Sequence, residues 1–186
     1  MENIRLLRAD EIDCRPQTVK AGGCSLLLYK DARCDMAIMD EVYGSLNWKR
    51  EHTRDNHNCI VSVWNSDIQQ WISKEDTGTE SNSEAAKGLA SDSFKRACVN
   101  FGIGRELYTA PFIWIKLSSG ETYTDSKGRP QLAIGLKFFV KKIEYKDRVI
   151  TGLTISDGKA DRFTMHDTGY TQQKPTDFSA AEKKLA

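Results

Sequence analysis

Apolar residues recur along the chain with spacings that predict a helix followed by three strands. From residue 26 to residue 43 they are three and four positions apart, and Gly44 follows as a stop signal. This spacing predicts an amphipathic helix over residues 26–43. Strand-like segments follow over residues 47–54, 58–64 and 71–79, with polar turns between them. Consecutive strands with short connections predict an antiparallel meander.

A second, longer helix is predicted to begin at the capping box Ser81-Asn82-Ser83-Glu84 and to end at Phe101. Its apolar residues fall in one stripe, and Gly102 follows as a C-terminal cap. Residues 112–117 then read as a strand, and residues 132–144 and 149–155 as a hairpin. The predicted fold class is therefore α+β: a core of helix, three-stranded meander and long helix, with an additional β-hairpin.

The end of the chain loses the hydrophobic periodicity. After Asp167 the sequence is polar, which is typical of a flexible tail. The length of 186 residues suits one sizeable core. We therefore predict one domain over residues 1–165 and a flexible C-terminal tail over residues 166–186.

Composition and charge narrow the class of protein. No apolar run is long enough to cross a membrane, and the N-terminus is too charged for a signal peptide, so we expect a cytoplasmic protein without membrane contact. The five cysteines are odd in number and contain no C-x-x-C pair. This favours free thiols in a reducing compartment over disulfides or a metal site. The net charge of +1 leaves room for a basic groove that forms only on folding or assembly.

The adjacent cations Lys95 and Arg96 are the main candidate for chemistry. The helical spacing places both of them, with Lys87, on the side of the second helix opposite its apolar stripe. Two fixed cations at the end of a packed helix can bind phosphate. The alternative is an ordinary solvated face, with Asp92 pairing with Arg96 one turn later.

Two further candidates lie nearer the N-terminus. Arg15 lies in a segment with proline and glycines, which predicts a loop. Tyr29 lies in the predicted first helix beside Lys30, a combination that suits nucleic-acid contact.

Sequence motifs typical of enzymes are missing: there is no G-x-x-x-x-G-K-[ST] motif, no nuclease-like carboxylate pattern and no histidine at ligand spacing. We therefore expect no enzyme activity and no cofactor.

Several motifs occur in order between residues 7 and 115: DCRPQTVKAGG, EVYGSLNW, KEDTGTES and, most specifically, ASDSFKRACVNFGIG. Together they resemble the annealing domain of the Rad fifty-two (Rad52) family, in particular its short phage-type members. The resemblance implies a homo-oligomeric ring that binds single-stranded DNA in a basic groove. It also implies annealing of complementary strands without ATP, in DNA recombination and repair. For a phage-encoded protein the compartment would be the host cell cytoplasm.

The resemblance assigns roles to individual residues. Lys95 and Arg96 match the basic pair of the family's inner groove, Arg15 its loop arginine, and Tyr29 its helix tyrosine. Val99 stands where the better-known eukaryotic members carry a further basic residue, and their basic insertion before the second helix is missing. Lys87 or Arg105 are the substitutes that the chain offers for an outer DNA site.

Two other classes of function remain open at this point. The order helix, three strands, helix is that of a double-stranded RNA binding module, although such modules begin their second helix with lysines. A structural oligomer or adaptor without a direct nucleic-acid role would leave Lys95 and Arg96 merely solvated. The tail over residues 166–186 is a candidate contact for a single-strand binding protein or a recombinase.

Overall fold

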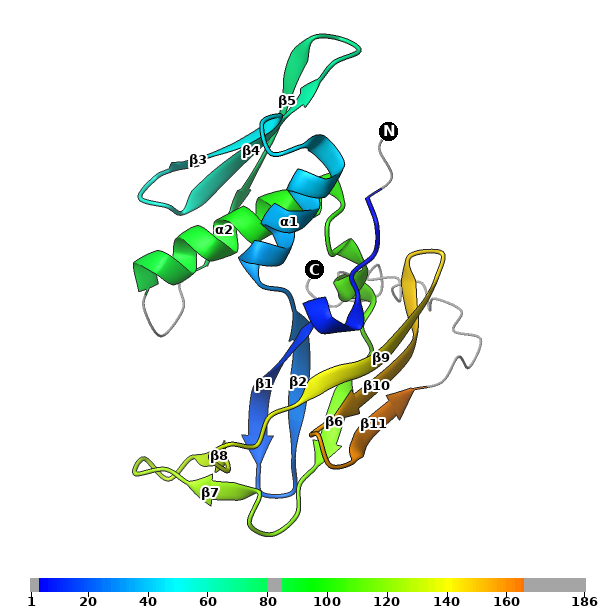
Figure 1. Ribbon diagram of the computed structural model, residues 1–186. Coiled ribbons are helices and arrows are strands. Elements are labelled where there is room, and N and C mark those ends of the chain that lie inside the picture. The colour runs from blue at the N-terminus through cyan, green and yellow to red at the C-terminus, as the bar shows by residue number, and fades with distance from the viewer. Residues whose placement is uncertain (1–3, 80–84, 166–186) are drawn as a thin grey trace, which may run out of the picture.

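The computed structural model describes residues 4–79 and 85–165, and of residues 85–87 it gives the backbone alone. Within these ranges two α-helices and eleven strands form an α+β fold (Figure 1). The elements in chain order are η1 (Ala9–Glu11), β1 (Asp13–Lys20), β2 (Gly23–Tyr29), α1 (Ala32–Tyr43), β3 (Trp48–Thr53), β4 (Asn58–Asn65), β5 (Gln70–Thr77), α2 (Ala85–Phe101), η2 (Arg105–Thr109), β6 (Ile113–Lys116), β7 (Thr122–Thr124), β8 (Pro130–Leu132), β9 (Phe139–Lys146), β10 (Val149–Ser156) and β11 (Asp161–Met165).

The strands form three antiparallel sheets. The largest has the order β11-β10-β9-β1-β2-β6, the second is the meander β3-β4-β5, and the third is the two-stranded ribbon β7-β8. In Figure 1 the meander and the two α-helices form the upper part of the molecule, and the six-stranded sheet forms the lower part. The ribbon β7-β8 lies at the lower left, beside the hairpin of β1 and β2.

One continuous cluster of buried side chains joins the two parts. In the upper part, Phe94 of α2 and Ile38 of α1 are fully buried with Val61 of β4. In the lower part, Ile115 of β6 and Ile155 of β10 are fully buried as well. Within the upper part, α2 packs against β4, β5 and α1.

The predicted meander is present, and so is the end of the second helix at Phe101. Gly102 follows α2 with φ +107°, a conformation that favours glycine, and thus ends the helix as expected. The capping box at residues 81–84 lies outside the described residues. The hairpin of β9 and β10 turns at Asp147 and Arg148, both with positive φ, also as expected.

The predicted helix over residues 26–43 is wrong in its first part. Leu26 and Leu28 are buried while Leu27 and Tyr29 are exposed, so these residues alternate as a strand and belong to β2. The helix begins only after Asp31, whose side chain accepts a hydrogen bond from the Arg33 amide as an N-cap. The short apolar run before Asp31 fits the spacing of a helix as well as that of a strand. It forms a strand because it pairs with β1 and β6.

The loop predicted around Arg15 is also wrong. Residues 13–20 form β1, which pairs with β2 through a tight turn at residues 21–22. The register of this pairing shifts between Pro16 and Thr18, which marks a β-bulge. A bulge is one of the few places where a strand accommodates a proline. The segment following residue 132 differs as well, because β9 begins only at Phe139 and Leu132 ends the ribbon strand β8.

Other sequence expectations concern cysteines, metals and membranes. All five cysteines are free thiols in this structure. Among residues 4–79 and 85–165 no group of three or more His, Cys, Asp or Glu side chains is arranged to hold a metal ion. None of the helices in these ranges is sufficiently long and apolar to cross a membrane.

Candidate nucleic-acid interface

Lys95 and Arg96 lie on the accessible side of α2 because their neighbours are fixed in the core. Phe94, Ala97 and Cys98 are completely buried. The burial of these three side chains sets the rotation of the helix about its axis. In this orientation 26% of the Lys95 side chain and 46% of the Arg96 side chain are exposed. The structure thus presents both cations to solvent, as the helical spacing predicts.

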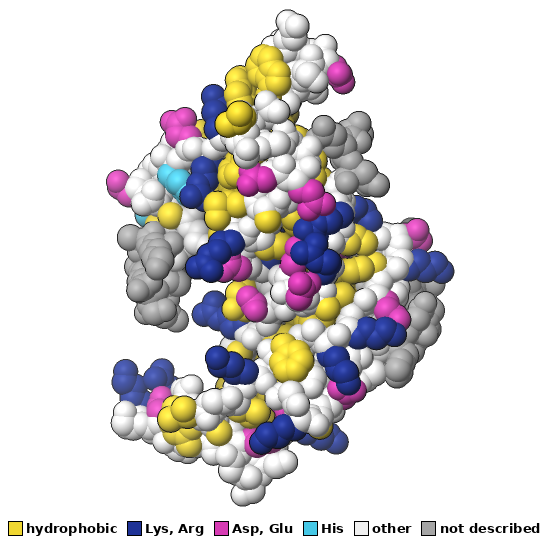
Figure 2. All heavy atoms as spheres, in the orientation of Figure 1, with side chains coloured by type: hydrophobic (Ala, Val, Ile, Leu, Met, Phe, Trp, Pro, Cys, Tyr) yellow, Lys and Arg dark blue, Asp and Glu magenta, His cyan; other side chains and the backbone are white. Residues whose placement is uncertain are grey.

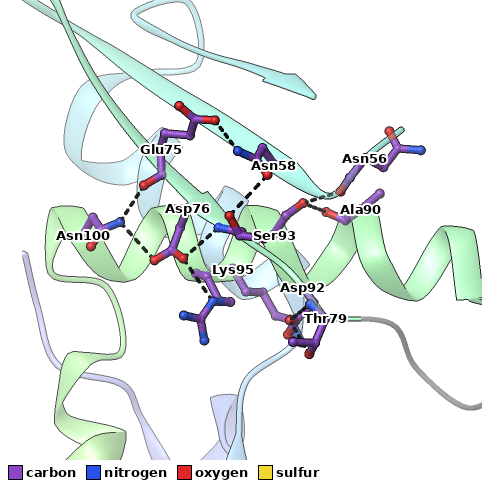
Figure 3. Close-up of polar contacts among 12 residues, drawn as sticks. Asn56, Asn58, Glu75, Asp76, Thr79, Ala90, Asp92, Ser93, Lys95 and Asn100 are labelled. Atoms are coloured by element: carbon purple, nitrogen blue, oxygen red, sulfur yellow. Dashed lines mark hydrogen bonds and ion pairs between the residues drawn. The ribbon is translucent and has the colours of Figure 1, made fainter. Parts of the chain in front are cut away.

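Arg96 pairs with an acid of the neighbouring strand. Its Nε donates to Asp76 Oδ1 of β5 at 3.1 Å. The other oxygen of Asp76 accepts from Asn100 Nδ2 at 3.2 Å, so the carboxylate is held by α2 at two positions (Figure 3). The expected ion pair between Asp92 and Arg96 is wrong, because β5 brings Asp76 next to Arg96. Asp76 lies 20 positions before Arg96, so helical spacing could not predict this contact.

Asp92 instead lies beside Lys95, at 4.0 Å from its Nζ. The same carboxylate accepts from the backbone amide of Thr79 at 3.0 Å (Figure 3). Exposed ion pairs contribute little to stability. A phosphate group can therefore replace Asp92 and Asp76 as the partner of these cations at a small energetic cost.

The outer face of the β1-β2 hairpin lies next to this part of α2. Tyr29 is 37% exposed and Leu27 49%. Their cross-strand partners are Asp13 and Arg15, respectively, so these four side chains share one face of the hairpin. Burial raises the pKa of Tyr29 and the charge of Asp13 raises it further, whereas the charge of Arg15 lowers it.

Two hollows meet between this hairpin and α2. The first has a volume of about 290 Å³ and the second about 490 Å³. Tyr29, Lys30 and Lys95 line both hollows, so the two hollows adjoin at these residues. We call the two hollows together the basic groove. Five cations line it against three aspartates: Lys30, Arg33, Arg50, Lys95 and Arg96 against Asp13, Asp31 and Asp92.

The floor of the basic groove contains a buried ion pair between Lys30 and Asp35. Lys30 is 4% exposed and Asp35 is completely buried. Lys30 Nζ donates to Asp35 Oδ1, whereas Asp35 Oδ2 has no hydrogen-bond partner among the described residues. Burial raises the pKa of Asp35 to about 6, and the positive charge of Lys30 opposes this effect.

Gly104 makes room for this lysine just after α2. Its φ of +67° lies in the left-handed region. A Cβ atom at this position would lie 2.3 Å from Lys30 Cε. The absence of a side chain at Gly104 therefore leaves room for the Lys30 stem, whose Nζ reaches Asp35.

The structure brings together most, but not all, of the predicted site residues. Lys95, Arg96 and Tyr29 line the basic groove. Arg15 is adjacent, because its partner Leu27 lines the same hollow. The side chain of Lys87 lies outside the described residues.

Arg105, the other substitute for an outer site, has a structural contact instead. Its Nη2 donates to the carbonyl groups of Val99 and Asn100 at 2.9 and 3.1 Å, and this caps the C-terminal end of α2. Val99, the departure from the family pattern, lines the basic groove.

Sequence reasoning missed Arg50 and His52 as groove residues. Both lie on β3 and line the second hollow. The Arg50 guanidinium stacks over Phe94 with 4.6 Å to the ring centre, and burial followed by the Arg50 charge lowers the pKa of His52. Nothing in the local sequence marks them, because only the packing of β3 against α2 brings them to the groove.

Fold and groove together define an α+β protein whose cations converge beside one packed helix. In a comparison with protein families, the model of the Rad52/22 family double-strand break repair protein matches residues 63–126. This range contains Lys95, Arg96 and the turn at Gly104. The match supports membership of the Rad52/22 family and thereby confirms the resemblance seen in the sequence. It indicates a role in DNA repair and recombination, with DNA as a partner.

Two other comparisons gave nothing. A search of curated proteins and a search of solved structures each found no significant match.

Proposed function

We propose that this protein binds single-stranded DNA in the basic groove and anneals complementary strands without ATP. It acts as a ring-forming homo-oligomer in homologous recombination. The observation that carries the proposal is the convergence of Lys95, Arg96 and Tyr29 on a groove that contains five cations. No covalent bond needs to form or break in this function, so the groove residues act by binding alone.

The chemistry of the basic groove suits a protein that holds the DNA backbone. Annealing requires that the bases stay free to find a partner, so the contacts should go to phosphates. Arg96 can form paired hydrogen bonds with a phosphate, and Lys95 offers a point charge beside it. Tyr29 offers an exposed aromatic ring on which any base can stack.

A ring explains how a chain with a net charge of +1 can bind DNA firmly. Each subunit contributes one groove, and repetition of a modest site multiplies the overall affinity. The meander has two unpaired edges, β3 and β5, in the described chain, and such edges can pair with a neighbouring subunit.

The test is an annealing assay with two complementary labelled oligonucleotides and no ATP. We expect the wild type to anneal them, and the double variant Lys95→Ala/Arg96→Ala to anneal at least tenfold more slowly. A matched control is Lys141→Ala/Lys142→Ala on β9. It also removes two cations, with side chains 56% and 68% exposed, that are paired with acids.

The outcomes separate the proposal from its rivals. Equal loss in the control would mean that net charge alone drives binding, and no loss in Lys95→Ala/Arg96→Ala would support a purely structural oligomer. Preference for duplex RNA over single-stranded DNA would favour an RNA-binding module, and strand cleavage with magnesium would reveal an enzyme. Ring assembly is checked by electron microscopy, where a monomeric particle would refute it.

The proposal extends to the cellular setting. We expect action in the cytoplasm, or in the host cell cytoplasm for a phage protein. The tail over residues 166–186 lies outside the described residues, and its proposed partner is a single-strand binding protein or a recombinase. Removal of the tail should then abolish the pull-down of that partner and leave annealing of naked oligonucleotides intact.

A further inference from the structure

The ribbon β7-β8, which the sequence did not predict, projects beside the β1-β2 hairpin (Figure 1). It places Tyr123 opposite Gln131 and Thr124 opposite Pro130. Tyr123 is 48% exposed, although its ring is large and apolar. An exposed aromatic on a short ribbon contributes little to the core, so its position calls for another explanation.

The base of the ribbon is fixed to the six-stranded sheet. Glu121 accepts two hydrogen bonds from the Arg162 guanidinium of β11, at 2.7 and 2.9 Å. Arg162 also donates to Asp157 at 2.6 Å, and only 14% of its side chain is exposed. Paired hydrogen bonds of this kind fix both direction and distance. The start of the ribbon is thus held against β11 by a paired contact.

The tip of the ribbon has its own network of contacts around Asp125. The Asp125 carboxylate accepts from the backbone amides of Lys127 and Arg129 at 2.8 and 2.9 Å, and these contacts lower its pKa. It also accepts from Arg129 Nε at 3.0 Å. This network holds the Arg129 side chain, which is 64% exposed, in one direction at the tip.

A hollow of about 420 Å³ separates the ribbon from β1. Tyr123, Arg129 and Gln131 line it on the ribbon side, and Pro16 and Gln17 on the β1 side. Figure 2 shows the molecule hollowed on the left, above the ribbon, with Lys and Arg side chains on both sides of the hollow.

This hollow lies farther along β1 than the basic groove. Asp13, at the start of β1, lines the basic groove, and Pro16 and Gln17 line the hollow under the ribbon. Arg15 lies between them. The edge of β1 is open here, because β9 pairs with β1 only at Asp13. At roughly 3.3 Å per residue, the two hollows lie within about 15 Å of each other along the strand.

We propose that the ribbon β7-β8 is the second wall of the DNA path, where Tyr123 stacks on a base and Arg129 binds a phosphate. The proposal rests on the function proposed above and adds a contact that the match to the family does not assign. Stacking on tyrosine accepts every base, which suits annealing of any sequence. A strand that leaves Lys95 and Arg96 along β1 would meet Arg15 and then the ribbon.

The experiment measures binding of the full chain to a fluorescein-labelled single-stranded oligonucleotide by anisotropy over a series of salt concentrations. Tyr123→Ala should weaken binding about tenfold, whereas Tyr123→Phe should bind like the wild type, because the ring is what stacks. Arg129→Ala should make the slope of log K against log salt shallower by about 0.7, the effect of one phosphate contact on a single strand.

Two control variants test whether the effect is local to the ribbon. Lys142→Ala removes one exposed cation of β9, and Phe112→Ala removes an aromatic that is 77% exposed. Both should bind like the wild type. With 2-aminopurine in the oligonucleotide, the wild type and Tyr123→Phe should quench its fluorescence, whereas Tyr123→Ala should not.

Three results would overturn the inference: wild-type affinity for Tyr123→Ala, an equal loss for Tyr123→Phe, or a changed particle size by light scattering, which would assign the ribbon to subunit contacts. If Lys95→Ala/Arg96→Ala loses binding while the ribbon variants do not, only this inference fails. If the wild type does not bind single-stranded DNA, the proposed function fails with it.

Discussion

The buried pair of Lys30 and Asp35 allows a sharp test of how the floor of the basic groove is stabilised. We consider the substitution Lys30→Met, which keeps a side chain of similar length and removes only the charged group. With Lys30 4% exposed and Asp35 0% exposed, water cannot replace the lost partner. Removing one member of a buried pair typically costs about 3–5 kcal/mol, because the other charge stays behind uncompensated.

This value is a large part of the total stability. Natural domains unfold with roughly 5–15 kcal/mol, so Lys30→Met should leave a marginal protein. For a chain of this length about 2–4 °C accompany each kcal/mol, which predicts a melting temperature lower by roughly 6–20 °C. The double variant Lys30→Met/Asp35→Leu should recover most of the loss, since no buried charge remains.

The assay is urea unfolding followed by tryptophan fluorescence, at one protein concentration because assembly affects apparent stability. The matched control is Lys142→Met. Lys142 also pairs with a carboxylate, that of Glu144, at 2.6 Å, but the two side chains are 68% and 48% exposed. Its substitution should therefore change stability by less than about 1 kcal/mol. Equal effects for Lys30→Met and Lys142→Met, or a double variant as unstable as Lys30→Met, would refute the reasoning.

Three further predictions concern the groove and its surroundings. Asp76→Asn frees the neighbouring arginine from its acid partner, so single-stranded DNA should bind a few-fold more tightly in an anisotropy titration; weaker binding would contradict this. Gly104→Ala places a methyl group against Lys30 at a positive φ and should lower the free energy of unfolding by about 1–3 kcal/mol, more than Gly120→Ala, which adds its methyl group in open space. The pKa of Asp35 is raised from 3.8 to about 6, so its contribution to stability is complete below pH 3.8 and is lost as the pH rises through 6; the difference in unfolding free energy between wild type and Asp35→Asn should fall across this range, and a constant difference would refute the shift.

Local signals were sufficient for the upper part of the molecule. The meander and the end of α2 follow from alternation, turn residues and a capping glycine, all of which act over a few residues. The same helical period placed Lys95 and Arg96 on the accessible side of α2. The meander, the end of α2 and the exposure of its two cations can therefore be predicted from residues that are close together in the sequence.

Local signals failed where two periods fit the same residues. Residues 26–29 satisfy a helical spacing and a strand spacing equally well, and only pairing with β1 and β6 makes them a strand. The ribbon β7-β8 has strands of three residues each, too short for any periodicity to show. The ion pairs of Arg96 with Asp76 and of Arg162 with Glu121 join residues 20 and 41 positions apart.

By itself, the sequence determined the α+β class, the meander, the cation pair on α2 and the resemblance to a family of DNA repair proteins. The tertiary structure decided that Tyr29 belongs to a strand, and that Lys30, Arg50 and His52 join Lys95 in one groove. The physical reason is that helix faces and turns depend on neighbours along the chain. A groove, its acid partners and its second wall depend on which elements pack together.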